Sequence, residues 1–177
     1  MKDILACRLI KGVVTRPAAD FKSPIDANIS AEVEKVGVEL KSAIAKNFAK
    51  SLNIRELDSG SCGACESEII STANPIYDCA RFGINFVASP RHADALLVTG
   101  PVSRNMLIAL KKTFQAMPEP KFVIALGDCA VNGGIFSDSY YTIGAVDRIL
   151  PVVLHISGCP PTPLDIMKSL LVFLGQK

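Results

Sequence analysis

The apolar positions of this chain follow two different patterns, and the change falls near residue 51. Before it, apolar side chains recur at three- and four-residue spacing, which predicts an amphipathic helix over about residues 30–50. Ser30 is a suitable N-cap for this helix, and acidic residues follow it in the first turn. The apolar side of the predicted helix consists of Val33, Val36, Val38, Leu40, Ala43, Ile44 and Phe48.

After residue 51, short apolar runs alternate with helical stretches. Strands that are apolar on both sides and separated by helices are typical of a parallel sheet with helices on both faces. The predicted fold class is therefore α/β, with an N-terminal extension (1–50) and a sheet domain (51–177). We expect strands within residues 51–57, 84–87, 95–99, 122–126 and 152–156, and helices at residues 64–74, 105–117 and 162–174.

The composition narrows the classes of protein that this chain can belong to. Its 177 residues are 49% apolar, enough for one packed core, and its net charge of +2 with both signs mixed gives no reason to expect nucleic acid as a partner. No apolar run approaches the ~18 residues of a membrane span. Charged residues interrupt the first eleven positions, so we expect no signal peptide. The start of the chain, up to residue 29, is either a tail or an arm that binds a partner subunit.

Six cysteines in a chain that is not exported are expected to be thiols or metal ligands rather than disulfides. Cys62 and Cys65 form a Cys-x-x-Cys pair directly after the first predicted strand, while Cys129 and Cys159 each follow a later strand. Ligands of parallel sheets bind beyond the carboxyl ends of the strands. The sequence therefore predicts that these four thiols meet at one edge of the sheet.

Three interpretations of these cysteines are open from the residues alone. A 4Fe–4S cluster suits ligands that are scattered along the chain, and Pro160 directly after Cys159 resembles the Cys-Pro of bacterial ferredoxins. A zinc ribbon would more often have a second closely spaced pair. Unligated buried thiols are the third interpretation, and it is the one that we prefer for Cys79, as a small core residue.

The chain resembles the small, cluster-bearing subunit of membrane-bound nickel–iron hydrogenases and, more distantly, the 20 kDa iron–sulfur subunit of respiratory complex I. The resemblance runs from about residue 54 to residue 174. It rests on separate motifs in the same order, which are Gly60-Ser61-Cys62-Gly63-Ala64-Cys65-Glu66-Ser67-Glu68-Ile69, Arg81-Phe82-Gly83, Ser89-Pro90-Arg91-His92-Ala93-Asp94, Thr99-Gly100-Pro101-Val102, Gly127-Asp128-Cys129, Gly133-Gly134-Ile135-Phe136 and Gly158-Cys159-Pro160-Pro161-Thr162-Pro163.

This resemblance implies a flavodoxin-like fold and one 4Fe–4S cluster on Cys62, Cys65, Cys129 and Cys159. The Cys-x-x-Cys spacing is the hydrogenase arrangement, because in complex I the first two ligands are adjacent. The resemblance further implies an electron-transfer subunit of an oxidoreductase complex, whose catalytic centre lies in a large partner subunit that bears nickel. The alternative is a nickel-free, complex I-like enzyme that reduces a quinone or sulfur.

The other expected partners are a ferredoxin-like iron–sulfur subunit and membrane subunits, with the complex on the cytoplasmic, inner face of the cell membrane. Two further residues become candidates through the family. Glu68 is a candidate for a proton-transfer or interface role, and Arg91 for an interface role. The simpler alternatives are a glutamate favoured by the start of a helix and an arginine that holds a turn.

Overall fold

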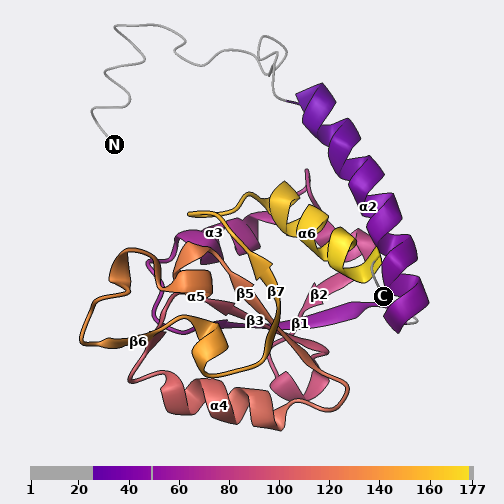
Figure 1. Ribbon diagram of the computed structural model, residues 1–177. Helices are drawn as coiled ribbons and strands as arrows, with labels where there is room; N and C mark the ends of the chain where they lie inside the picture. Colours follow the sequence, from indigo (N-terminus) through magenta and orange to yellow (C-terminus); the bar gives the residue numbers. More distant parts are fainter. Residues whose placement is uncertain (1–25, 49, 176–177) are drawn as a thin grey trace, which may run out of the picture.

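The computed structural model describes residues 26–48 and 50–175, and its centre is a five-stranded parallel sheet (Figure 1). The strand order β2-β1-β3-β5-β7 is that of the flavodoxin-like doubly wound folds, so the predicted fold class is confirmed. The expectation of an arm before residue 29 falls largely on residues 1–25, outside the described chain. The strands are β1 (Leu52–Asp58), β2 (Ile84–Phe86), β3 (Ala95–Thr99), β5 (Phe122–Leu126) and β7 (Val152–Ile156).

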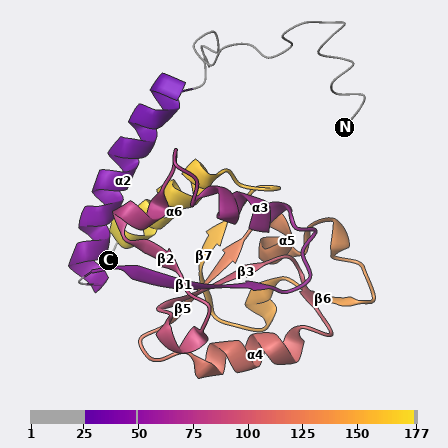
Figure 2. The same cartoon turned by 180° about the vertical axis from the view of Figure 1, so that it is seen from behind.

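Helices cover both faces of this sheet, as Figure 2 also shows from behind. One face carries α2 (Asp26–Phe48), α3 (Ala64–Ser71) and α6 (Pro163–Gly175), and the other carries α4 (Leu107–Ala116) and α5 (Asp128–Asn132). Successive residues of a strand point to opposite faces. Within β3, Leu97 accordingly packs in the core beneath α6, and Leu96 and Val98 pack in the core above α4.

The N-terminal helix is part of the first of these two cores. Val33, Leu40 and Ile44 are fully buried among side chains of the sheet and α6. A Cβ atom on Gly37 would lie 2.2 Å from the Phe82 ring, so the absence of a side chain at Gly37 makes room for that ring. The predicted helix at 30–50 is present but begins at Asp26, which makes the proposed N-cap Ser30 an interior residue.

Several short elements were not predicted. A two-stranded antiparallel sheet joins β4 (Val102–Ser103) to β6 (Thr142–Gly144), and α5 has five residues. Short 3-10 helices, η2 (Cys79–Phe82), η3 (Pro90–His92), η4 (Gly134–Phe136) and η5 (Val146–Arg148), complete the connections. These helices complete about one turn, and β4 and β6 contain too few residues for a hydrophobic period to reveal them. In the described part of the chain, no helix has both the length and the apolar character needed to span a bilayer.

Candidate functional site

The loop after β1 is folded by its own side chains before the chain enters α3. One carboxylate oxygen of Asp58 accepts hydrogen bonds from the backbone N–H groups two and three residues later, both at 2.7 Å. Ser59 is fully buried, and its hydroxyl donates to the carbonyl of Thr99 at 2.7 Å, which fixes the loop to β3. This arrangement places Cys62 on the exposed loop and Cys65, half-buried, in the first turn of α3.

The loops after β5 and β7 are joined by two reciprocal hydrogen bonds. The backbone N–H of Asp128 donates to the carbonyl of Gly158 at 2.9 Å, and the N–H of Gly158 donates to the carboxylate of Asp128 at 2.8 Å. Cys129 and Cys159 each follow one member of this pair directly. Because Asp128 and Gly158 hold the loops together, the positions of the two cysteines depend on each other.

Two glycines allow a close approach of backbone to sulfur. A Cβ atom on Gly127, whose φ is +86°, would lie 2.6 Å from the Sγ atom of Cys65. A Cβ atom on Gly134 would lie 2.7 Å from the Sγ atom of Cys129. Any larger residue at either position would displace the thiol, so the backbone forms part of a cradle for sulfur atoms.

The three loops enclose a cavity of about 450 Å³ at the carboxyl edge of the sheet. Three of the four predicted thiols line it, and the fourth, that of Cys65, lies against Gly127. Ile135 and Phe136 contribute an apolar wall. The structure therefore brings together the residues that the sequence placed here. The complete lining is Cys62, Asp128, Cys129, Asn132, Gly134, Ile135, Phe136 and Cys159.

The thiols are close enough to influence one another electrostatically. Burial raises the pKa of Cys65 to about 12, and the negative charges of Glu66, Cys62, Cys129 and Cys159 add to this effect. Burial is also the largest cause that raises the pKa of Cys129, and the negative charges of Cys159 and Cys62 raise it further. Four thiolates gathered in this way repel one another unless a positive group lies between them. A bound metal centre supplies that charge and replaces the protons.

The donor set fits an iron–sulfur cluster. Three thiols line a cavity large enough for an inorganic core, the thiol of Cys65 lies beside Gly127, and glycines leave space beside two of the sulfur atoms. Among the described residues, no three His, Cys, Asp or Glu side chains form a group that could hold a single metal ion. A cubane cluster separates its thiolates more widely than one ion does.

Sequence reasoning missed one residue beside this site. Both carboxylate oxygens of Glu66 are buried and have no hydrogen-bond partner among the described residues. Glu66 follows Cys65 directly and occupies the first turn of α3. Its position next to a Cys-x-x-Cys pair is visible in the sequence, but its burial depends on the packing of α3 against the sheet.

The remaining sequence candidates lie outside the cysteine-lined cavity. Glu68 is half-buried on α3, and Arg91 is exposed in η3, where its backbone N–H donates to the Ser89 hydroxyl at 3.3 Å. Neither side chain belongs to the described lining of the cavity. Cys79 is buried, with 3% of its surface exposed, which confirms its interpretation as a core residue.

Comparison with known proteins supports the resemblance that the motifs indicated. The family model described as NADH ubiquinone oxidoreductase, 20 Kd subunit, matches residues 62–173, a range that contains all four site cysteines. The chain is 41% identical to formate hydrogenlyase subunit 7 of Escherichia coli over 160 residues, which cover 89% of this chain and 63% of that protein. It therefore spans less than two thirds of that relative's length.

Two further similarities add to this picture. A probable membrane-bound hydrogenase subunit of Pyrococcus furiosus is 43% identical over 133 residues, which cover 75% of this chain and 80% of the relative. Among solved structures, a chain of the membrane-bound sulfane sulfur reductase, an archaeal respiratory membrane complex, matches with a TM-score of 0.65 and 34% identity, covering 78% of this chain and 75% of that chain.

Proposed function

Because the chain belongs to the NADH ubiquinone oxidoreductase 20 Kd subunit family, we propose that it is the electron-transfer small subunit of an oxidoreductase complex. It binds one 4Fe–4S cluster through Cys62, Cys65, Cys129 and Cys159. The observation that carries this proposal is the shared cavity, in which loops after three different strands bring the thiols together. When bound, the cluster supplies one-electron transfer.

The surrounding residues have separate tasks in this proposal. The thiolates hold the iron, and the reciprocal hydrogen bonds between Asp128 and Gly158 fix two of the three loops. Gly127 and Gly134 leave the space that two of the sulfur atoms need. Ile135 and Phe136 make one side of the site apolar, and the polarity and solvent access around a metal centre influence its reduction potential.

The loop from Ile135 to Thr142, which begins at the wall of the cavity, is suited to contact with a large partner subunit. Ile135 is 90% exposed and Tyr140 is 88% exposed, although both are large and apolar in character. The loop that carries them is fixed, because the Thr142 hydroxyl donates to the Phe136 carbonyl and Arg104 Nε donates to the Tyr140 carbonyl, both at 2.8 Å. Exposed apolar and aromatic side chains on a fixed backbone are typical of the energetic centre of an interface.

We propose that this partner holds a nickel–iron site and that electrons reach the cluster from a ferredoxin-like iron–sulfur subunit. The complex would be attached to the inner face of the cell membrane through its membrane subunits. Support comes from the names of the two relatives, a formate hydrogenlyase subunit and a membrane-bound hydrogenase subunit. The Cys62–Cys65 spacing is also that of the hydrogenase arrangement.

A second candidate function is a complex without nickel that reduces sulfur or a quinone. The similarity to a chain of the sulfane sulfur reductase, with a TM-score of 0.65, favours this alternative. In both cases the four cysteines have the same task, and the two functions differ in the partner's active site.

Glu68 and Arg91 are proposed for roles outside cluster binding. Glu68 lies on α3, one turn beyond Cys65, where a carboxylate can transfer protons or contact a neighbouring subunit. Arg91 is exposed and is proposed to pair with acidic groups of a partner.

Metal analysis of the purified complex tests the cluster assignment. We expect about four irons and four acid-labile sulfides per copy of this chain. Cys129→Ser or Cys159→Ser should remove or convert the cluster, and the matched control Cys79→Ala should retain it, since Cys79 lies in the core. One zinc with no sulfide would disprove the cluster.

The same preparation separates the two candidate reactions. Nickel together with hydrogen production from reduced ferredoxin or reduced viologen supports the hydrogenase. A nickel-free complex that reduces a quinone or polysulfide rapidly would favour the alternative, while the cluster assignment would stand.

A further inference from the structure

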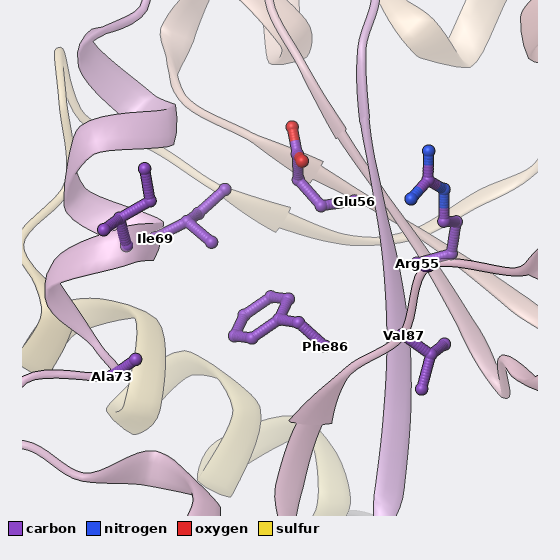
Figure 3. A pocket seen from close by; sticks show the side chains of 8 residues that line it. Arg55, Glu56, Ile69, Ala73, Phe86 and Val87 are labelled. Carbon is purple, nitrogen blue, oxygen red and sulfur yellow. The ribbon is translucent and has the colours of Figure 1, made fainter.

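A second cavity lies between α3 and the β2 edge of the sheet, and it shares no lining residue with the cysteine-lined cavity (Figure 3). Its volume is about 360 Å³. Ile69, Ile70 and Ala73 form the α3 side, and Phe86 and Val87 form the side at the end of β2. In Figure 3 the Phe86 ring points across this groove toward Ile69.

Large apolar side chains in and beside this groove are exposed to solvent. Ile70 is 73% exposed and Phe86 is 39% exposed, and Ile76, in the turn that follows α3, is 49% exposed. β2 is an edge strand that pairs only with β1 among the described strands. An open strand edge beside exposed apolar side chains is a typical surface for association with another polypeptide.

The groove also contains a carboxylate without a counter-ion. Residues alternate along β1, so Glu56 points toward α3, whereas Arg55 lies on the other side of the strand in Figure 3. Within the described chain, Glu56 has no hydrogen bond or ion pair. Burial raises the pKa of Glu56, and the negative charge of Glu66 raises it further. The positive charge of Arg55 lowers this pKa, but by less than Glu66 raises it.

Glu66 extends the negative character toward the beginning of α3. It precedes Ile70 by four residues, which places these two residues on one side of the helix. Both oxygens of Glu66 are buried and unpartnered among the described residues. A buried carboxylate is costly unless a cation pairs with it. The groove thus combines apolar walls with negative charge at one end.

We propose that this groove binds a segment of a partner subunit in which an arginine or lysine is flanked by apolar side chains. The apolar side chains would cover Ile70 and Phe86, and the cation would pair with Glu56. Arginine suits the site best, because its guanidinium binds carboxylates in a bidentate manner while its stem packs on apolar walls. This surface is additional to the proposed contact at the cluster and does not depend on that contact.

Subunit retention in the intact complex tests the proposal. The complex is purified through a tag on another subunit, and the amount of this chain is measured for Ile70→Glu, Glu56→Arg and the control Ile108→Glu. Ile108 is a 65% exposed isoleucine on α4, on the opposite face of the sheet. We expect about tenfold lower retention for Ile70→Glu and Glu56→Arg, as for the central residues of an interface, and no loss for Ile108→Glu.

Iron and sulfide content serve as the folding control and should be unchanged in all three variants. This control distinguishes a wrong proposal for the groove from a wrong cluster assignment, because retention tests the first and iron and sulfide content test the second. Equal retention of Ile70→Glu and Ile108→Glu would overturn the proposal.

Crosslinking identifies the occupant directly. A benzoylphenylalanine is introduced at position 70 in the intact complex, and the crosslinked peptide is identified by mass spectrometry. We expect one segment of a different subunit that contains an arginine or lysine between apolar residues. Changing that cation to glutamate should restore the retention that Glu56→Arg loses. Crosslinks to residues 1–25 of the same chain, to a second copy of it, or to no protein would each refute the proposal.

Discussion

Replacement of Gly127 by alanine separates the role of backbone conformation from the role of space beside sulfur. The new Cβ would lie 2.6 Å from the Sγ atom of Cys65, where ordinary contact requires 3.4 Å or more. The thiol must therefore move by most of an ångström, which is well beyond the ~0.2 Å that ligand distances at a metal tolerate. Gly127 also has φ +86° and ψ 154°, a region used almost only by glycine, so the backbone adds about 1–3 kcal/mol of strain.

Gly63→Ala is the matched control. Gly63 has the same φ of +86° with ψ −7°, and a Cβ atom added there would have no other atom within 4 Å. Its left-handed conformation costs alanine about 1–2 kcal/mol, without displacing a thiol.

Iron and sulfide per chain, together with thermal unfolding of the purified complex, compare the two variants. We expect Gly63→Ala to retain the cluster and Gly127→Ala to lose most of it. Full cluster content in Gly127→Ala would show that Cys65 does not occupy this position in the assembled site.

Two further predictions concern the core. Gly37→Ala places a Cβ 2.2 Å from the Phe82 ring, so chemical unfolding should show that the free energy of unfolding falls by about 1–3 kcal/mol, although alanine is the better helix former. The control Gly175→Ala has open space around its Cβ and should leave the free energy of unfolding unchanged. Burial raises the pKa of Cys79 from 9.0 to about 11, so the unfolded state releases this proton first and stability should fall by about 1–3 kcal/mol between those pH values. The same pH dependence in Cys79→Ala would contradict that assignment.

The sequence alone predicted the elements that a run of neighbouring apolar residues marks. The five consecutive apolar residues of β3 and of β5 required burial on both faces, and this required helices on both sides. In a parallel sheet, the carboxyl ends of all strands lie at the same edge. The convergence of Cys62, Cys129 and Cys159 on one cavity follows from that topology.

What the sequence did not predict depends on contacts between distant segments. The pairing of β4 with β6 rests on two- and three-residue strands that lie about 40 positions apart, and no period marks them. The start of α2 was placed at Ser30 because serine is a good cap, whereas the helix continues back to Asp26. The burial of the Glu66 carboxylate likewise arises from the docking of α3 and has no signature of its own in the sequence.

The two proposed sites share one electrostatic property, and this property connects them to assembly. The cysteine-lined cavity gathers four thiols whose negative forms repel one another. The groove beside α3 contains Glu56, and the negative charge of Glu66 raises the pKa of both Glu56 and Cys65. A fold that places so many acidic groups around one helix is stabilised by whatever positive groups bind there, because they bind the native arrangement and not the unfolded chain. Iron at one end of α3 and a partner's cation along its side would therefore each favour the same docked position of that helix.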